Sequence, residues 1–245
     1  MRLLTTESQI PTVELFVKDP PPYAILSHRW QDDEVTFQDI SRPDVSQKMK
    51  GYEKLVSSCQ IARKLGFKYL WMDTCCIDKT NSDELTEAIN SMYRWYKQSG
   101  VCLAFLFDVE TTDPESAAES KWFTRGWTLQ ELIAPTEVIF YNQKWQLCGT
   151  KTSMAFQIRE RTGIDEVVLL TGNMDSIPVA RKMFWASSRE TQRPEDEAYS
   201  LLGIFGINMP AIYGEGHRAF VRLQEEILKT TLDHSIFAWG SRQVW

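Results

Sequence analysis

The stretch Tyr23-Ala-Ile-Leu-Ser-His-Arg-Trp30 begins with an unbroken apolar run and passes directly into polar and aromatic residues. Three later segments, Tyr69–Met72, Val101–Phe107 and Val138–Tyr141, have the same unbroken apolar character. Apolar runs without polar alternation are typical of strands buried on both faces, as in a parallel sheet. We therefore expect four buried strands at 23–26, 69–72, 101–107 and 138–141.

Helical patterns separate these predicted strands. Apolar residues recur at helical spacing in 47–65, 82–98 and 127–132, and Gly66 is well placed to end the first helix. Alternation of strands with helices predicts right-handed crossovers and a doubly wound α/β fold with a mostly parallel sheet.

The two ends of the chain differ from this middle part. Residues 1–22 look polar and irregular, and they end in a proline triplet that stiffens the entry to the first strand. After residue 150 helical patterns dominate, at 152–161, 195–205 and 216–232. We expect an N-terminal segment at 1–22, an α/β core at 23–150 and a helical extension of the same domain at 151–245.

Composition excludes several classes of function. Lys and Arg total 27 and Asp and Glu total 33, so the net charge of −6 argues against sequence-independent nucleic-acid binding. The longest apolar run is too short to span a bilayer, and no secretory signal is visible at the N-terminus. Five cysteines without a CxxC pair fit reduced thiols, so we expect a cytoplasmic protein.

Polar clusters follow three of the predicted strands. Ligands of open α/β sheets sit beyond the carboxyl ends of the strands, so these clusters are expected on one edge. Arginine and lysine there suit phosphates, and tryptophan suits a flat ring. The candidate binding residues are Ser27, His28, Arg29, Trp30, Asp73, Asp78, Lys79, Arg125 and Trp127.

Ordinary structural roles compete with these assignments. Arg29 could form an ion pair with Asp73 or Asp78, His28 could be a hydrogen-bonded strand-end residue, and Glu131 taken alone could be a solvated helix residue. Further along, Arg189, Glu195 and Asp196 could extend a pocket or tie helices together, and we expect the second role.

Other catalytic constellations are weaker. The chain has no GxxxxGK[ST] motif, which disfavours a P-loop nucleotidase, and its three histidines lack zinc-site spacing, so no metal is expected. Cys75 or Cys76 with His28 could form a thiol–imidazole pair, which leaves a Cys–His hydrolase as an alternative.

Three ordered blocks of this sequence resemble the fungal heterokaryon incompatibility (HET) domain. They are Tyr23–Trp30, Leu70–Lys79 and Arg125–Leu132, and segments near 181–186, 193–203 and 209–216 extend the resemblance to about residues 23–240. The resemblance implies a role in cell death when incompatible fungal individuals fuse. It also implies that an NTP-driven oligomerisation module and a repeat sensor follow the domain, or that a partner receptor serves it.

HET domains in turn resemble TIR domains, which have a flavodoxin-like sheet. Active TIR domains carry a glutamate four residues after a tryptophan, and the spacing from Trp127 to Glu131 is similar. This resemblance implies that Glu131 is catalytic and that NAD is a substrate rather than a resident cofactor. The His28-Arg29-Trp30 sequence and the helical extension depart from the TIR pattern.

The resemblance therefore leads us to expect an NAD glycohydrolase activated by self-association. Loss of nicotinamide develops positive charge on the ribose, which a carboxylate at Glu131 would stabilise, while Arg29 and Lys79 would hold the pyrophosphate. The main alternative is a non-catalytic signalling module that triggers cell death through aromatic contacts.

Overall fold

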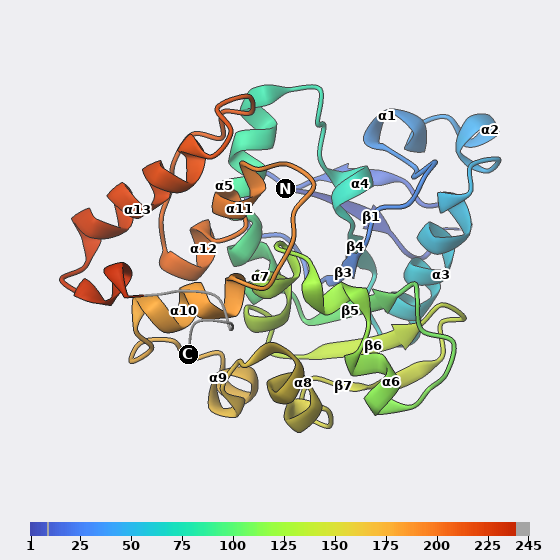
Figure 1. Cartoon of the computed structure of the whole chain (residues 1–245). Coiled ribbons are helices and arrows are strands. Elements are labelled where there is room, and N and C mark those ends of the chain that lie inside the picture. Colours follow the sequence, from blue (N-terminus) through green and yellow to red (C-terminus); the bar gives the residue numbers. More distant parts are fainter. Residues whose placement is uncertain (9, 239–245) are drawn as a thin grey trace.

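The computed structural model describes residues 1–8 and 10–238. Among these residues, seven strands form one mixed sheet in the order β2-β1-β4-β3-β5-β6-β7, so the fold is α/β (Figure 1). The strands are β1 (Arg2–Thr5), β2 (Val13–Leu15), β3 (Ala24–His28), β4 (Tyr69–Trp71), β5 (Val101–Leu106), β6 (Val138–Asn142) and β7 (Leu147–Thr150).

The four predicted strands form the parallel centre of the sheet. β3 pairs in parallel with β4 on one side and with β5 on the other, and β5 pairs in parallel with β6. The residues of β3 and β5 are all buried, as continuous apolar runs between two helical layers require. β7 adds an antiparallel edge strand that the apolar runs did not indicate.

The expectation of an irregular segment at 1–22 is wrong. β1 pairs antiparallel with β4, and β2 pairs with β1, so this segment extends the sheet. Leu3 and Leu4 are fully buried in β1. Two apolar residues were too short a pattern to indicate a strand, and it is pairing with β4 that buries them.

The first strand also continues further than expected. The prediction ended it at Leu26, whereas Ser27 and His28 still pair with Ala104 and Phe105 of β5. β3 lies between two partners and its pairing with β4 already stops at Ile25, so β5 alone holds this polar end in the sheet.

Short and long helices fill the connections. The α-helices are α1 (Phe37–Ile40), α2 (Pro43–Ser46), α3 (Gly51–Lys64), α4 (Asp73–Cys76), α5 (Ser82–Gln98), α6 (Pro114–Ala118), α7 (Thr128–Ile133), α8 (Ala155–Thr162), α9 (Glu166–Thr171), α10 (Val179–Ala186), α11 (Asp196–Tyr199), α12 (Leu202–Phe205) and α13 (Arg218–Thr230). Two 3₁₀ helices, η1 (Lys121–Thr124) and η2 (His234–Phe237), complete the described elements.

The helices form layers on both sides of the sheet. Figure 1 shows α3 on one side of the central strands and α5 and α7 on the other, as in a doubly wound fold. α12 packs against α5, and α9 packs against α7, so the helices after residue 150 cover that second layer. The space between α5, α7 and these later helices is what shapes the site described below.

Two helix ends follow the local sequence, and one expected helix is divided. Gly66 adopts the left-handed conformation (φ +89°) just after α3, and the Asn81 side chain caps α5 by accepting from the backbone amides of Asp83 and Glu84. The single helix expected over 195–205 is instead two helices, α11 and α12. This break brings Gly203 against Tyr93 of α5, where a Cβ would lie 2.0 Å from the Tyr93 Cβ.

Helices also dominate the described part of the predicted extension, as expected. Its last stretch, 239–245, lies outside the described residues. In the part of the chain that the structure describes, no helix combines the length and apolar character that crossing a membrane requires.

Candidate functional site

A cavity of about 420 Å³ lies beyond the carboxyl ends of the parallel strands. Loops that follow β3, β4 and β5 line it, at the point where β4 lies on one side of β3 and β5 on the other. Open α/β sheets bind ligands at such a reversal of strand order, and this volume lies within the range of small-molecule sites.

The structure brings most of the candidate residues to this cavity. Those that line it are His28, Arg29, Trp30, Asp73, Lys79, Arg125, Trp127 and Glu131. Ser27 lies behind the surface and contacts Glu131. Asp78 does not line the cavity, because its carboxylate accepts hydrogen bonds from Gln38 and Thr80 at the outside of the loop.

Glu131 is held from behind by a chain of hydrogen bonds. The Trp122 indole N–H donates to Ser27 Oγ at 2.8 Å, and the Ser27 hydroxyl donates in turn to Glu131 Oε2. The Tyr96 hydroxyl, which donates to Leu26 O at 3.2 Å, also lies near this carboxylate and lowers its pKa. α7 supplies Glu131 and β3 supplies Ser27, so the carboxylate is fixed where helix and sheet meet.

Burial dominates the electrostatics of Glu131. The residue is only 8% exposed, and burial raises the pKa of its carboxyl to about 7, although Ser27 and the Arg125 guanidinium lower it. The expectation that Glu131 could be a solvated helix residue is therefore wrong. At neutral pH the group exists both as a carboxylate and as a carboxylic acid.

Asp73 organises the opposite side of the cavity. Its carboxylate accepts hydrogen bonds from the Trp30 indole at 2.7 Å and from Lys79 Nζ at 3.3 Å, and it lies 3.0 Å from His28 Nε2. Burial alone would raise the pKa of Asp73, but Lys79, His28 and Trp30 bring it well below its usual range. Asp73 is thus a fully ionised anchor.

Lys79 and Trp30 form one unit with this anchor. The Lys79 ammonium lies 3.2 Å from the centre of the Trp30 ring, in addition to its salt bridge with Asp73. One face of the indole is therefore covered by the ammonium. The charge of Lys79 is already neutralised, which leaves it less free to meet a phosphate than the sequence indicated.

His28 is held between two charged groups. Its Nε2 faces Asp73, and its Nδ1 lies 4.0 Å from Glu34, whose carboxylate is paired with the buried Lys54. Burial, followed by the Lys54 charge, lowers the pKa of His28. The imidazole is therefore neutral at neutral pH and serves as a bridge between β3 and α4.

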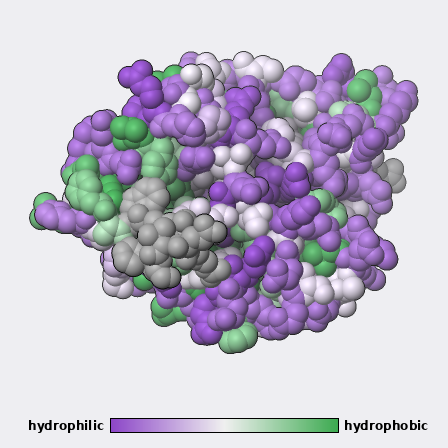
Figure 2. All heavy atoms as spheres, viewed as in Figure 1, coloured by the Kyte–Doolittle hydropathy of each residue, from purple (hydrophilic) through white to green (hydrophobic). Residues whose placement is uncertain are grey.

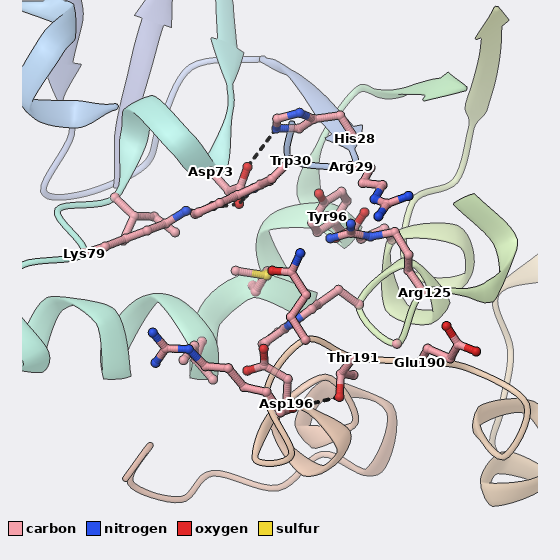
Figure 3. A pocket seen from close by; sticks show the side chains of 18 of the residues that line it. His28, Arg29, Trp30, Asp73, Lys79, Tyr96, Arg125, Glu190, Thr191 and Asp196 are labelled. Carbon is pink, nitrogen blue, oxygen red and sulfur yellow. Dashed lines mark hydrogen bonds and ion pairs between the residues drawn. The ribbon is translucent and has the colours of Figure 1, made fainter. Parts of the chain in front are cut away.

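Arg29 and Arg125 are two of the cavity's cations that form no salt bridge with a described residue. Lys121 and Arg193 also line the cavity without one, and the Arg193 guanidinium lies over the Tyr213 ring. Neither Arg29 nor Arg125 forms a salt bridge with any of residues 1–8 and 10–238, so the ion pair that competed for Arg29 does not form. The Arg29 guanidinium lies 5.1 Å from the Phe107 ring, and Arg125 Nε is buried without a hydrogen-bond partner among those residues. Figure 3 shows both side chains reaching into the cavity.

The region after residue 150 supplies a wall that the sequence did not predict. A parallel β-bridge joins Arg125 to Glu190, with Gly126 N donating to Glu190 O at 2.8 Å and Glu190 N donating to Thr124 O at 2.7 Å. The residues that this region adds to the cavity are Glu190, Thr191, Gln192, Arg193, Asp196 and Tyr213. The polar run 189–196 between two apolar helices was the one available signal.

Three residues of that run have different roles. Glu195 accepts the backbone amides of Gly214 and Gly216, and Arg189 donates to Arg125 O and Thr128 Oγ1, so both tie segments together as expected. Asp196 instead lines the cavity, which corrects the expectation for this residue.

The contacts of the cysteines do not support a Cys–His hydrolase. Burial raises the pKa of both thiols, that of Cys76 to about 12. Cys75 Sγ faces the Val35 carbonyl, and Cys76 Sγ accepts from Met72 N, while His28 is bonded to Asp73. A nucleophilic thiol needs the opposite conditions, a lowered pKa and an adjacent base. In the described residues no group of three or more His, Cys, Asp or Glu side chains is arranged to hold a metal ion.

Comparisons with known proteins match the same segments. The family "Heterokaryon incompatibility protein (HET)" matches residues 23–115, and a domain of unknown function (DUF8212) matches residues 218–244. The "Vegetative incompatibility protein HET-E-1" of Podospora anserina is 44% identical over 231 residues. That alignment covers 89% of this chain but only 17% of the relative, so the chain spans about a sixth of that protein.

No solved structure matches the chain. The segment matched by the HET family contains β3, β4 and β5, together with the strand-end residues His28, Arg29 and Asp73. The chain therefore belongs to the fungal heterokaryon incompatibility family and carries a HET domain.

Proposed function

We propose that the cavity binds NAD or a related nucleotide and that Glu131 assists cleavage of the bond between nicotinamide and ribose. The observation that carries this proposal is a buried carboxylate in a nucleotide-sized cavity, held by a hydrogen bond from Ser27 and accompanied by Arg29 and Arg125, which form no salt bridge with a described residue. Glu131 lies in α7, the helix between β5 and β6, and lines the cavity at the edge where α/β folds bind ligands.

The chemistry requires little beyond these groups. As the nicotinamide–ribose bond breaks, its electron pair goes to the ring nitrogen and positive charge develops on the sugar. The Glu131 carboxylate stabilises that charge, water adds to the anomeric carbon, and one proton is released. Nicotinamide leaves as a neutral base, so no general acid is needed and a neutral His28 is compatible with the reaction.

Phosphate binding falls to Arg29 and Arg125 in this proposal. Lys79 is paired with Asp73 and covers Trp30, whereas the two guanidinium groups have no carboxylate partner among the described residues. Guanidinium groups bind phosphate oxygens in bidentate fashion, which also orients the ligand. This assignment shifts the pyrophosphate away from Lys79, the residue that the sequence analysis favoured.

The fold supports a relation to flavodoxin-like and TIR domains. Counted along the chain, the four parallel strands follow the order 2-1-3-4, which corresponds to the flavodoxin-like arrangement. Trp127 lines the cavity at the start of α7, and Glu131 lines it from the same helix. Both residues of the Trp-to-Glu spacing therefore lie at the cavity.

The biological role proposed here is cell death in fungal incompatibility. The relative from Podospora anserina is a vegetative incompatibility protein, and it is much longer than this chain. We propose that the domain acts in the cytoplasm, that copies associate to become active, and that further modules or a receptor control this association.

Nicotinamide release from NAD by the purified chain, followed at high protein concentration, tests the activity. We expect turnover in the wild type and a loss of about 10²–10³-fold in Glu131→Gln, the usual effect of removing one preorganised group. Glu53→Gln is the matched control, because Glu53 is exposed on α3 and does not line the cavity. Equal turnover in wild type and Glu131→Gln would contradict the role of the carboxylate.

A non-catalytic signalling module is the second candidate, and a surface feature favours it. Leu228, Leu232 and Phe237 are exposed at α13 and η2, where Figure 2 shows hydrophobic residues gathered on an otherwise hydrophilic face. If toxicity on expression in a fungal host survives Glu131→Gln but is lost in Leu232→Ser, the signalling function is favoured over cleavage.

A further inference from the structure

Asp196 is an acidic residue of the cavity with no cation bound to it. Its carboxylate accepts from the Tyr213 hydroxyl at 2.9 Å and from the Trp127 side chain. No salt bridge within 4 Å joins it to a residue in the described ranges, in contrast to Asp73 with its Lys79 partner. Both of its partners are thus uncharged donors on aromatic rings.

The carboxylate retains capacity to accept further hydrogen bonds. A carboxylate offers about four lone-pair positions, and two donors occupy only part of them. Asp196 is partly buried, and burial raises its pKa against the lowering effects of Tyr213, Trp127 and the nearby Arg193 charge. Figure 3 shows Asp196 directed into the cavity from the side opposite His28 and Asp73.

The surroundings of Asp196 are those of a slot for a flat ring. Trp127 and Tyr213 line the cavity beside it. Leu85, Ile89 and Met92 also line the cavity, and their spacing places them along one face of α5. α12 packs against α5, and α11 immediately precedes α12. This packing places Asp196 of α11 on the side of the cavity that the apolar face of α5 lines. The Arg193 guanidinium lies 4.5 Å from the centre of the Tyr213 ring and covers one of its faces, so Trp127 and the α5 residues supply the free apolar surface of the slot.

We infer that Asp196 determines ligand specificity by accepting a hydrogen bond from an amino group on an aromatic ring of the nucleotide. In NAD that donor is either the adenine amino group or the nicotinamide carboxamide. The inference rests on the proposed function for the class of ligand, and it gives the region after residue 150 a direct part in recognition. Arg29 and Arg125 then bind the phosphates, and the ring occupies the slot between α5 and α11.

Two NAD analogues separate the possible donors. Nicotinamide purine dinucleotide lacks only the adenine amino group, and 3-acetylpyridine adenine dinucleotide has a methyl group in place of the carboxamide NH₂. Binding of NAD and both analogues is measured by calorimetry in the Glu131→Gln protein, so that the ligand is not consumed. The same measurements are repeated with Asp196→Asn, Asp196→Ala and, as control, Asp44→Asn, which is exposed on α2 away from the cavity.

We expect the Glu131→Gln protein to bind NAD roughly 10-fold more tightly than one of the two analogues, because that analogue leaves the Asp196 carboxylate without its donor. The preference should fall to within about 2-fold in both Asp196 variants and persist in Asp44→Asn. Thermal unfolding of each variant establishes that it is folded, and the ratio of affinities cancels any uniform loss of binding.

A preference that is unchanged in both Asp196 variants, for either analogue, overturns the inference while leaving cleavage by Glu131 intact. NAD binding that depends on Asp196 without any nicotinamide release from the wild type supports the inference and overturns the proposed cleavage. Absence of binding by all three dinucleotides, in the wild type as well as in Glu131→Gln, overturns both.

Discussion

Glu131 is a carboxyl group that the fold holds at an electrostatic cost. Burial raises the pKa of the group from 4.5 to about 7, and the two values differ by an amount that corresponds to about 3 kcal/mol. Because the folded state binds this proton more tightly than the unfolded state, the cost is absent at low pH. It grows as the pH rises from 4.5 to about 7 and is complete above that.

The variant Glu131→Gln should therefore be more stable than the wild type in alkaline solution. We expect its advantage in free energy of unfolding to rise from about 1 kcal/mol at pH 5 to about 3 kcal/mol at pH 8, because the amide carries no charge to bury. Urea unfolding at the two pH values measures this difference. A constant difference between pH 5 and pH 8 would argue against a buried titrating carboxyl at this position.

Ser27 positions that carboxylate from behind. The variant Ser27→Ala removes the hydrogen bond to Glu131 and leaves the buried Trp122 N–H without its acceptor, a loss of about 1–3 kcal/mol in stability. Since the Ser27 hydroxyl lowers the pKa of Glu131, its removal should raise that pKa further.

The pH dependence of NAD cleavage distinguishes this positioning role from a purely structural one. Activity that needs the carboxylate rises with pH through the pKa of Glu131, and in Ser27→Ala this rise should move to higher pH. A pH–rate profile of nicotinamide release gives the midpoint directly. An unchanged midpoint together with lower stability would mean that Ser27 contributes only to packing.

At the scale of elements, the parts that could be predicted are those whose pattern is local. The strands β3, β4, β5 and β6 each carry an unbroken apolar run, and α5 carries an apolar face and a capping residue, so local sequence is sufficient. β1 and the edge strand β7 could not be predicted, because partners far away in the sequence determine that they form strands.

The bridge between Arg125 and Glu190 is another element that no local pattern encodes. It depends on Gly126, where a Cβ would lie 2.5 Å from Thr191 Cγ2 and 3.3 Å from Ser200 Oγ. The variant Gly126→Ala must displace the 190–193 segment and should lower stability by about 1–3 kcal/mol. Because this segment lines the cavity, affinity for NAD should fall as well.

The double variant Gly126→Ala/Thr191→Ser tests this mechanism. Serine lacks Cγ2 but keeps the hydroxyl that donates to Arg193 O, so the added methyl group gains room. We expect the second substitution to restore part of the thermal midpoint and of the NAD affinity lost in Gly126→Ala. No recovery would mean that the loss arises elsewhere, for instance at Ser200.

At the scale of the whole molecule, the site is shared between the sheet and the helices that follow it. The strand-end rule located Arg29 and Asp73 from the sequence, because both follow parallel strands, whereas Glu131 was indicated by the resemblance to TIR domains. It could not locate Asp196 and Tyr213, since residues 151–238 add no strand to the sheet. Their place in the site depends on how α12 packs against α5.

The packing of α12 against α5 should affect the unfolding of the entire chain. In Gly203→Ala the new Cβ would meet Tyr93 Cβ and Cγ at 2.0 and 2.5 Å, atoms too close to the α5 backbone to move aside. The helices must separate, and we expect a loss of at least about 1–3 kcal/mol.

Since the later helices cover the same layer as α5 and α7, sheet and helices should lose structure together. Hydrogen exchange in increasing urea, read by mass spectrometry on peptides from 101–106 and 196–205, should give one common midpoint in the wild type and a lower common midpoint in Gly203→Ala. Separate midpoints, with 196–205 exchanging while 101–106 stays protected, would mean that the sheet is stable alone. The helices after residue 150 could then unfold while the sheet stays folded, and the site would lose the residues that they contribute.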